Sequence, residues 1–190
     1  MSEVAQAARE TLIAELREHA LVIGEVTLSS GKKAAYYVDA KRALLLPVCF
    51  RALGDLVADE ATQRGASAVG GLTMGADPIA CAALAAEAGS GLRAFFVRKE
   101  RKEHGLQRWI EGPVLEPGAS CLIVEDVVTT GGSTVKAIER VLEEGFEVAG
   151  VLSVVDRLAG GGEAITEAAG GAPYSALVTI DDLYPDRPDG

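Results

Sequence analysis

The sequence predicts an α/β protein in which helices flank a central parallel sheet of five strands. Two observations lead to this class. Five short, nearly uninterrupted apolar runs suit strands covered on both faces; they lie at residues 66–72, 92–97, 121–124, 147–155 and 174–180. Helical patterns alternate with these runs, which predicts a doubly wound sheet with right-handed crossovers.

The remaining elements can be assigned in order along the chain. Apolar residues recur at helical spacing over residues 1–20, and a short strand is expected at 22–28. A second helix is expected over 47–64, because proline suits a first helical turn. An acidic first residue and an alanine-rich body predict a helix over 77–87, and one apolar face predicts another over 133–144.

Composition and charge exclude several classes of protein. The chain has 190 residues, of which 48% are hydrophobic, so one globular domain with a sizeable core is expected. Its 28 acidic and 18 basic residues give a formal net charge of −10, so the surface as a whole repels nucleic-acid phosphates and anionic lipids. We therefore expect neither a nucleic acid nor a membrane as a partner.

Cysteine usage and the N-terminal segment indicate the compartment. Cys49, Cys81 and Cys121 are odd in number, widely spaced and without metal-ligand spacing, as expected of core thiols in a reducing environment. Residues 1–17 carry charges of both signs and have no pattern of an export signal. A cytoplasmic protein is expected.

The most informative segment is CLIVEDVVTTGGST at residues 121–134. Glu125 and Asp126 are expected where the third strand leaves the sheet, with residues 129–134 forming the turn into a helix. Small residues in such a turn let backbone amides approach a phosphate, and the helix N-terminus favours its charge. Paired carboxylates accept hydrogen bonds from vicinal hydroxyls, so a ribose 5-phosphate fits. A Walker-type phosphate loop is excluded, and the alternative is an acidic helix cap with a glycine turn.

Residues 98–108, RKERKEHGLQR, concentrate five basic residues and one histidine. A charge run of this kind is often only a solvated, mobile connection. Because it follows the second strand, however, it is also placed to cover a diphosphate. There it would neutralise the negative charge that grows on the diphosphate as it leaves, and it would exclude water.

A third segment, residues 27–42, combines Ser29, Ser30 and Gly31 with Lys32 and Lys33 and the aromatic pair Tyr36 and Tyr37. Taken alone it is equally compatible with an ordinary hairpin, since aromatic residues favour strands.

Together the three segments resemble orotate phosphoribosyltransferases, which are type I phosphoribosyltransferases; the likeness spans roughly residues 10–160, and the basic segment separates them from the purine enzymes. It implies the type I phosphoribosyltransferase fold in a single domain over residues 1–190. An N-terminal helix and small hood would occupy about residues 1–45, and the core about 46–190.

The resemblance also implies roles for individual residues. The residues that would bind 5-phosphoribosyl 1-diphosphate (PRPP) are Arg98, Lys99, Lys102, His104, Glu125, Asp126, Val127, Val128, Thr129, Thr130, Gly131, Gly132 and Ser133. Lys102 and His104 would be catalytic. A loop of Thr73, Met74 and Gly75 would contact the diphosphate. Those that would bind orotate are Tyr36, Tyr37, Thr129 and Arg157; for Arg157, a surface ion pair with Asp156 is the alternative.

The implied reaction converts orotate and PRPP into orotidine 5′-phosphate and diphosphate, in pyrimidine biosynthesis. Mg2+ is expected as cofactor, held through substrate and water rather than directly by the protein. A homodimer is implied, with each basic segment serving the neighbouring subunit. The rival functions are a purine phosphoribosyltransferase and a non-catalytic nucleotide-sensing regulator.

Three positions depart from the pattern of the family. Many members have lysine where this chain has Ser29 and Met74, and the commoner first acid of the pair is aspartate rather than Glu125. Two cationic contacts to the diphosphate are therefore absent from their usual positions.

Overall fold

The structure is a computed structural model that describes residues 3–27, 31, 33–101 and 109–188. A six-stranded sheet in the order β5-β4-β3-β6-β7-β8 forms its centre. The strands are β3 (Ala68–Leu72), β4 (Arg93–Val97), β5 (Ile110–Glu111), β6 (Ser120–Val128), β7 (Glu147–Asp156) and β8 (Tyr174–Thr179). The five predicted strands are confirmed as parallel neighbours, and β5 is an additional antiparallel edge strand.

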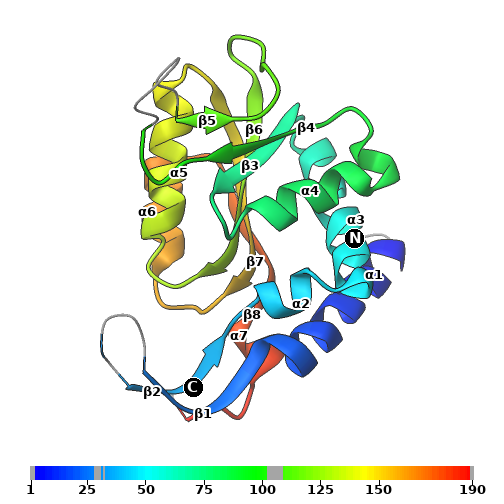
Figure 1. The fold of residues 1–190 in the computed structure, drawn as a ribbon, viewed down its shortest axis with the longest axis vertical. Helices are drawn as coiled ribbons and strands as arrows, with labels where there is room; N and C mark the ends of the chain where they lie inside the picture. Colours follow the sequence, from blue (N-terminus) through cyan, green and yellow to red (C-terminus); the bar gives the residue numbers. More distant parts are fainter. Residues whose placement is uncertain (1–2, 28–30, 32, 102–108, 189–190) are drawn as a thin grey trace.

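Helices cover both faces of this sheet (Figure 1). The main ones are α1 (Glu3–Glu15), α3 (Pro47–Gln63), α4 (Asp77–Ala85), α5 (Gly132–Glu143) and α6 (Gly161–Ala168). Side chains of α1, α3 and α4 bury one apolar cluster with one face of the sheet. Those of α5 and α6 bury a second cluster on the other face. Both faces of the sheet are thus buried against helices, as its continuous apolar runs predict.

The N-terminal region forms a smaller unit beside this core. After α1 come a π-helical turn, η1 (Leu16–Ala20), and the antiparallel strands β1 (Leu21–Thr27) and β2 (Lys33–Val38). The single helix expected over residues 1–20 is therefore interrupted in its last turn. Strands β1 and β2 form a hairpin, which is compatible with both interpretations of residues 27–42, and Figure 1 shows this hairpin at the end of the molecule away from the β5–β6 connection.

Short helices complete the fold. They are α2 (Lys41–Leu44), the 3₁₀ turn η2 (Glu87–Gly89) and α7 (Ile180–Leu183). Arg9 ties the first helix to the last, because its guanidinium donates to the Leu177 carbonyl and to Asp182, both at 2.8 Å. No helix among the described residues is long and apolar enough to cross a membrane.

Candidate functional site

The two acidic residues lie inside strand β6, not beyond its end. The predicted strand over 121–124 was too short: pairing with β7 continues through Glu125 and Val127 to Val128. Backbone hydrogen bonds do not require apolar side chains, so the strand does not stop where the apolar run stops. The turn that follows is correspondingly shorter, and α5 begins at Gly132.

Glu125 is a buried carboxyl, with only 5% of its surface exposed. Thr134 donates a hydrogen bond to its Oε2 at 3.2 Å, and the Asp126 backbone N–H donates to Oε1 at 3.3 Å. Burial, followed by the neighbouring charge of Asp126, raises the pKa of Glu125 to about 8. Near neutral pH the acidic pair therefore carries less than two full negative charges.

This raised pKa predicts how stability changes with pH. In the unfolded chain Glu125 loses its proton near pH 4.5, whereas in the folded chain it keeps it until about pH 8. Between these values the unfolded state binds fewer protons, so a rise in pH favours unfolding. Glu125→Gln should remove this contribution. Between pH 5 and 8, the Tm of the variant minus the Tm of the wild type should therefore increase by at least about 2–4 °C, the shift produced by ~1 kcal/mol. Parallel Tm curves in thermal melts would contradict the assignment.

Asp126 is held by two donors on its two oxygens. Its Oδ1 accepts the Val127 backbone N–H at 2.9 Å, and its Oδ2 accepts the ammonium of Lys41, also at 2.9 Å. Lys41 lies within the third segment, residues 27–42, but the sequence reasoning gave it no role, because nothing local indicates a contact with a residue 85 positions later. Only the packing of α2 beside the end of β6 brings it to the site.

The loop after β3 packs directly on the acidic pair. A Cβ atom at Gly75 would lie 2.6 Å from Asp126 Oδ1 and 3.0 Å from Glu125 Oε1, so a larger residue would require the loop or these carboxyl groups to shift. Thr73, which donates to Asp77 at 2.7 Å, precedes a cis peptide bond to Met74, and the Met74 side chain is exposed. The predicted diphosphate loop thus lies beside the predicted ribose site.

The turn from β6 into α5 forms a polar hollow of about 350 Å3. Gly131, at φ +79°, provides the left-handed residue that starts the helix. The glycine-rich start of α6 supports the turn from behind, where a Cβ at Gly161 would lie 2.7 Å from the Thr129 carbonyl oxygen. The residues that line the hollow are Glu125, Val127, Val128, Thr129, Thr130, Gly131, Gly132, Ser133, Thr134 and Lys136. Of these, Thr134 and Lys136 were not predicted as site residues.

The predicted orotate-binding residues are only partly brought together. Tyr36 is buried, and the Arg157 guanidinium lies 5.1 Å from its ring centroid, while Tyr184 packs edge-on at 5.7 Å. Tyr37 points to the other face of β2 and is 39% exposed, as alternation along a strand requires. The Nε of Arg157 is buried and has no hydrogen-bond partner among the residues that the structure describes.

The suggested ion pair between Arg157 and Asp156 is not formed in the structure described here. Asp156 instead accepts hydrogen bonds from the Tyr174 hydroxyl at 3.0 Å and from the Leu158 backbone N–H at 2.7 Å. Arg157 is instead directed toward the ring of Tyr36.

The basic segment is described only at its two ends. Arg98 and Lys99 line a hollow of about 460 Å3 together with Thr73, and Arg98 pairs with Glu111 at 3.3 Å. Lys102 and His104 lie outside the described residues. Where the chain is described again, the Trp109 backbone N–H donates to Glu144 at 2.9 Å, and the guanidinium carbon of Arg140 lies 3.8 Å from the Trp109 ring centroid.

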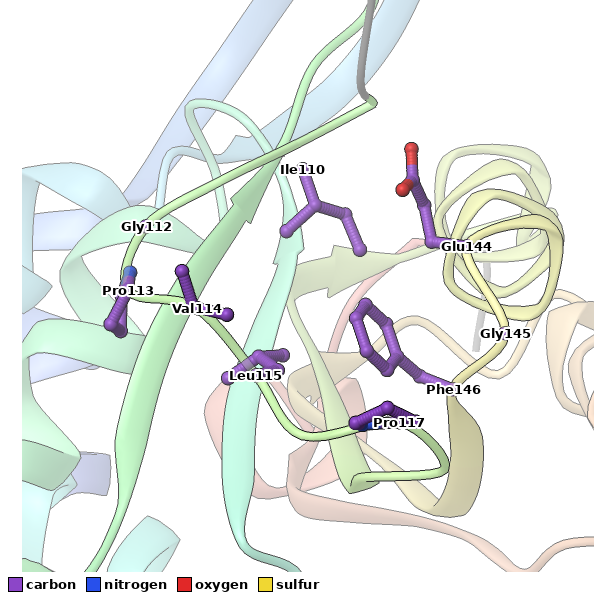
Figure 2. A pocket seen from close by; sticks show the side chains of 9 residues that line it. All are labelled: Ile110, Gly112, Pro113, Val114, Leu115, Pro117, Glu144, Gly145 and Phe146. Atoms are coloured by element: carbon purple, nitrogen blue, oxygen red, sulfur yellow. The ribbon is translucent and has the colours of Figure 1, made fainter. Parts of the chain in front are cut away.

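Another hollow shares no lining residue with the hollow of the acidic pair and the phosphate turn. It measures about 320 Å3, and Figure 2 shows Ile110, Leu115 and Phe146 pointing toward one another in it. Apart from Ile110 in β5, its walls come from the segments that precede β6 and β7, at the amino ends of these parallel strands. Ligands of open α/β sheets bind beyond the carboxyl ends, where the acidic pair and the phosphate turn lie. This second hollow is therefore not the candidate site.

Comparisons with known proteins define first the class and then the family. Residues 52–169 match the family model of the phosphoribosyl transferase domain. The orotate phosphoribosyltransferase of Corynebacterium glutamicum strain R is 49% identical over 176 residues, covering 93% of this chain and 94% of that protein. That of Streptomyces avermitilis is 48% identical over 177 residues, covering 92% of this chain and 96% of that protein.

Solved structures agree with the sequence relatives. The Mycobacterium tuberculosis H37Rv orotate phosphoribosyltransferase in complex with PRPP is 39% identical to this chain and matches its structure with a TM-score of 0.79. The match covers 93% of this chain and 98% of the Mycobacterium tuberculosis chain. The chain therefore belongs to the orotate phosphoribosyltransferases, transferases of pyrimidine biosynthesis, and has their type I phosphoribosyltransferase fold.

Proposed function

We propose that this chain transfers the 5-phosphoribosyl group from PRPP to orotate at the carboxyl end of its sheet, with a magnesium ion. The observation that carries the proposal is the meeting of three recognition elements there. The acidic pair is suited to the ribose hydroxyls, the turn of residues 129–133 to the 5-phosphate, and the loop of residues 73–75 to the diphosphate.

Orotate is placed by Tyr36 and Arg157. The Arg157 guanidinium lies 5.1 Å from the ring centroid of the buried Tyr36, and it offers planar donors that match a carboxylate. The Arg157 backbone N–H donates to the Val128 carbonyl at 2.9 Å, so an orotate held by Arg157 would lie near Thr129, just after the end of β6. Tyr37 keeps its predicted role as a neighbour of orotate only if a contact forms on its exposed side.

The chemistry requires positioning rather than a protein nucleophile. The bond from the anomeric carbon to the diphosphate oxygen breaks with its electron pair leaving on the diphosphate. N1 of orotate releases its proton to water and supplies the electron pair of the new bond to the anomeric carbon. Positive charge grows on the ribose ring and negative charge on the leaving group. Arg98, Lys99, Lys102 and His104 would stabilise the leaving diphosphate.

The donor set near the loop of residues 73–75 fits magnesium. Asp126 supplies carboxylate oxygens, the ligand type that this ion prefers, and no group of three or more metal-ligating side chains occurs among the described residues. The ion would then be held largely by PRPP and water. When bound, it would neutralise charge on the diphosphate.

The chain is also proposed to work as a cytoplasmic homodimer in which the basic segment of one subunit serves the site of the other. The three cysteines are free thiols in the structure, which suits a reducing compartment.

A substrate panel tests this function and its metal requirement. With PRPP and Mg2+, we expect the absorbance of orotate to fall, and we expect no nucleotide to form from adenine, guanine or hypoxanthine. Chelation by EDTA should reduce the rate by at least about 100-fold, the scale of one lost charge-stabilising contact, and added Mg2+ should restore it. Turnover of a purine base, or an unchanged rate in EDTA, would refute the corresponding part of the proposal.

A further inference from the structure

Lys41 links the N-terminal unit to the acidic pair. It is the first residue of α2, immediately after β2, and its ammonium lies 2.9 Å from Asp126 Oδ2 and 3.4 Å from Asp39 Oδ1. Asp39 is itself fixed by its backbone N–H, which donates to the Ala20 carbonyl at 2.9 Å. Two carboxylates from different parts of the chain therefore direct one cation toward the end of β6.

The charges around Lys41 favour a lasting contact. Partial burial acts to lower the pKa of Lys41, but hydrogen bonds and charges from Asp126 and Asp39 outweigh it and raise the pKa. The lysine is thus fully protonated at neutral pH. The side chain of Asp126 is only 13% exposed, so its pairing with Lys41 is screened less than a surface ion pair.

The bonds to Asp126 leave acceptor capacity for a substrate. A carboxylate can accept about four hydrogen bonds, and the Val127 N–H and the Lys41 ammonium use one on each oxygen. Each oxygen keeps a lone pair, while rotation of the carboxylate is restrained from both sides. Such restraint lowers the entropy that is lost when a ligand is bound.

We propose that Lys41 is a positioning residue for PRPP, which holds the Asp126 carboxylate in the orientation that accepts the ribose hydroxyls. The proposal rests on the placement of the ribose at the acidic pair made above. Lys41 acts through Asp126 and is not assigned a contact with the reacting atoms.

A double-mutant cycle tests this role. Binding of PRPP with Mg2+, measured by calorimetry without orotate, should weaken about 10-fold in Lys41→Met, a size typical of coupled neighbours. Asp126→Asn should weaken binding at least as much, and Lys41→Met should have no further effect in the Asp126→Asn background. The KM for orotate at saturating PRPP should change by less than about 2-fold in Lys41→Met. The proposal gives Lys41 a partner in the ribose site only, and substitutions act independently at sites that share no partners.

Matched variants separate positioning from folding. Lys41→Arg keeps the cation and should restore PRPP affinity to within about 3-fold of wild type, since an arginine also pairs with carboxylates. Arg42→Met removes an exposed cation from the same helix and should bind PRPP as the wild type does. Asp39→Asn, which removes the second partner of Lys41, should weaken PRPP binding less than Lys41→Met.

The outcomes distinguish the two proposals. Wild-type affinity in Lys41→Met, with weakened binding in Asp126→Asn, would overturn the role of Lys41 and leave the ribose site intact. Additive effects of the two substitutions would also overturn it, because Lys41 would then act independently of Asp126. Wild-type affinity in Asp126→Asn would refute the ribose placement itself, and with it the proposal for Lys41.

Discussion

Replacing Lys102 with alanine is expected to lower kcat by about 100- to 1,000-fold, the range seen when one preorganised charge-stabilising group is lost. Diphosphate gains negative charge as its bond to the ribose breaks, and Lys102 is the proposed cation at that position. Steady-state kinetics with saturating orotate and PRPP measure the effect. Arg101→Ala, in the same basic segment, is the matched control and should retain wild-type kcat. An unchanged kcat in Lys102→Ala would remove its catalytic role.

The same variant tests whether the basic segment acts between subunits. Lys102→Ala and Asp126→Asn should each be nearly inactive alone. In a mixed dimer, the site with an intact Asp126 receives the intact Lys102 of the other subunit. Activity should therefore return when the two variants are mixed and their dimers exchange subunits. If exchange is verified and activity stays absent, the segment serves its own chain.

The second large effect is expected from Gly75→Ala. The added Cβ would lie 2.6 Å from Asp126 Oδ1, so either the loop of residues 73–75 must withdraw or the Asp126 carboxylate must rotate. Both movements displace groups that bind PRPP, and misplacing such groups is expected to lower kcat/KM by about 100-fold. The loss should appear in kcat/KM for PRPP at saturating orotate.

A control for this substitution lies in the connection before β4. A Cβ at Gly91 would meet no atom within 4 Å, so Gly91→Ala should leave kcat/KM for PRPP unchanged. Circular dichroism and a thermal melt should show both variants folded. If Gly75→Ala binds and turns over PRPP as the wild type does, the loop is not the diphosphate site.

Much of the fold and part of the site can be predicted from contiguous patterns. The five parallel strands follow from apolar runs, and the turn around Gly131 follows from the motif after β6. Patterns in sequence carry such information because each reports a local geometry, a covered strand or a left-handed turn.

What could not be predicted depends on contacts between distant segments or on very short elements. Strand β5 has only two residues, too few for any periodicity. Helix α6 begins in a run of glycines, which obscures its apolar face. The contacts of Lys41 with Asp126 and of Arg157 with Tyr36 join elements far apart in sequence, and they follow from how α2 and β2 pack beside the sheet.

The contact between Trp109 and Arg140 has a practical consequence. The chain contains one tryptophan, so indole fluorescence comes from a single place, the point where the chain rejoins the sheet after the basic segment. The guanidinium packed 3.8 Å from the ring centroid places a cation over the indole face and makes its emission depend on that contact. The protein thereby carries an intrinsic optical probe beside its proposed catalytic segment, and substrate titrations can be followed without an attached dye.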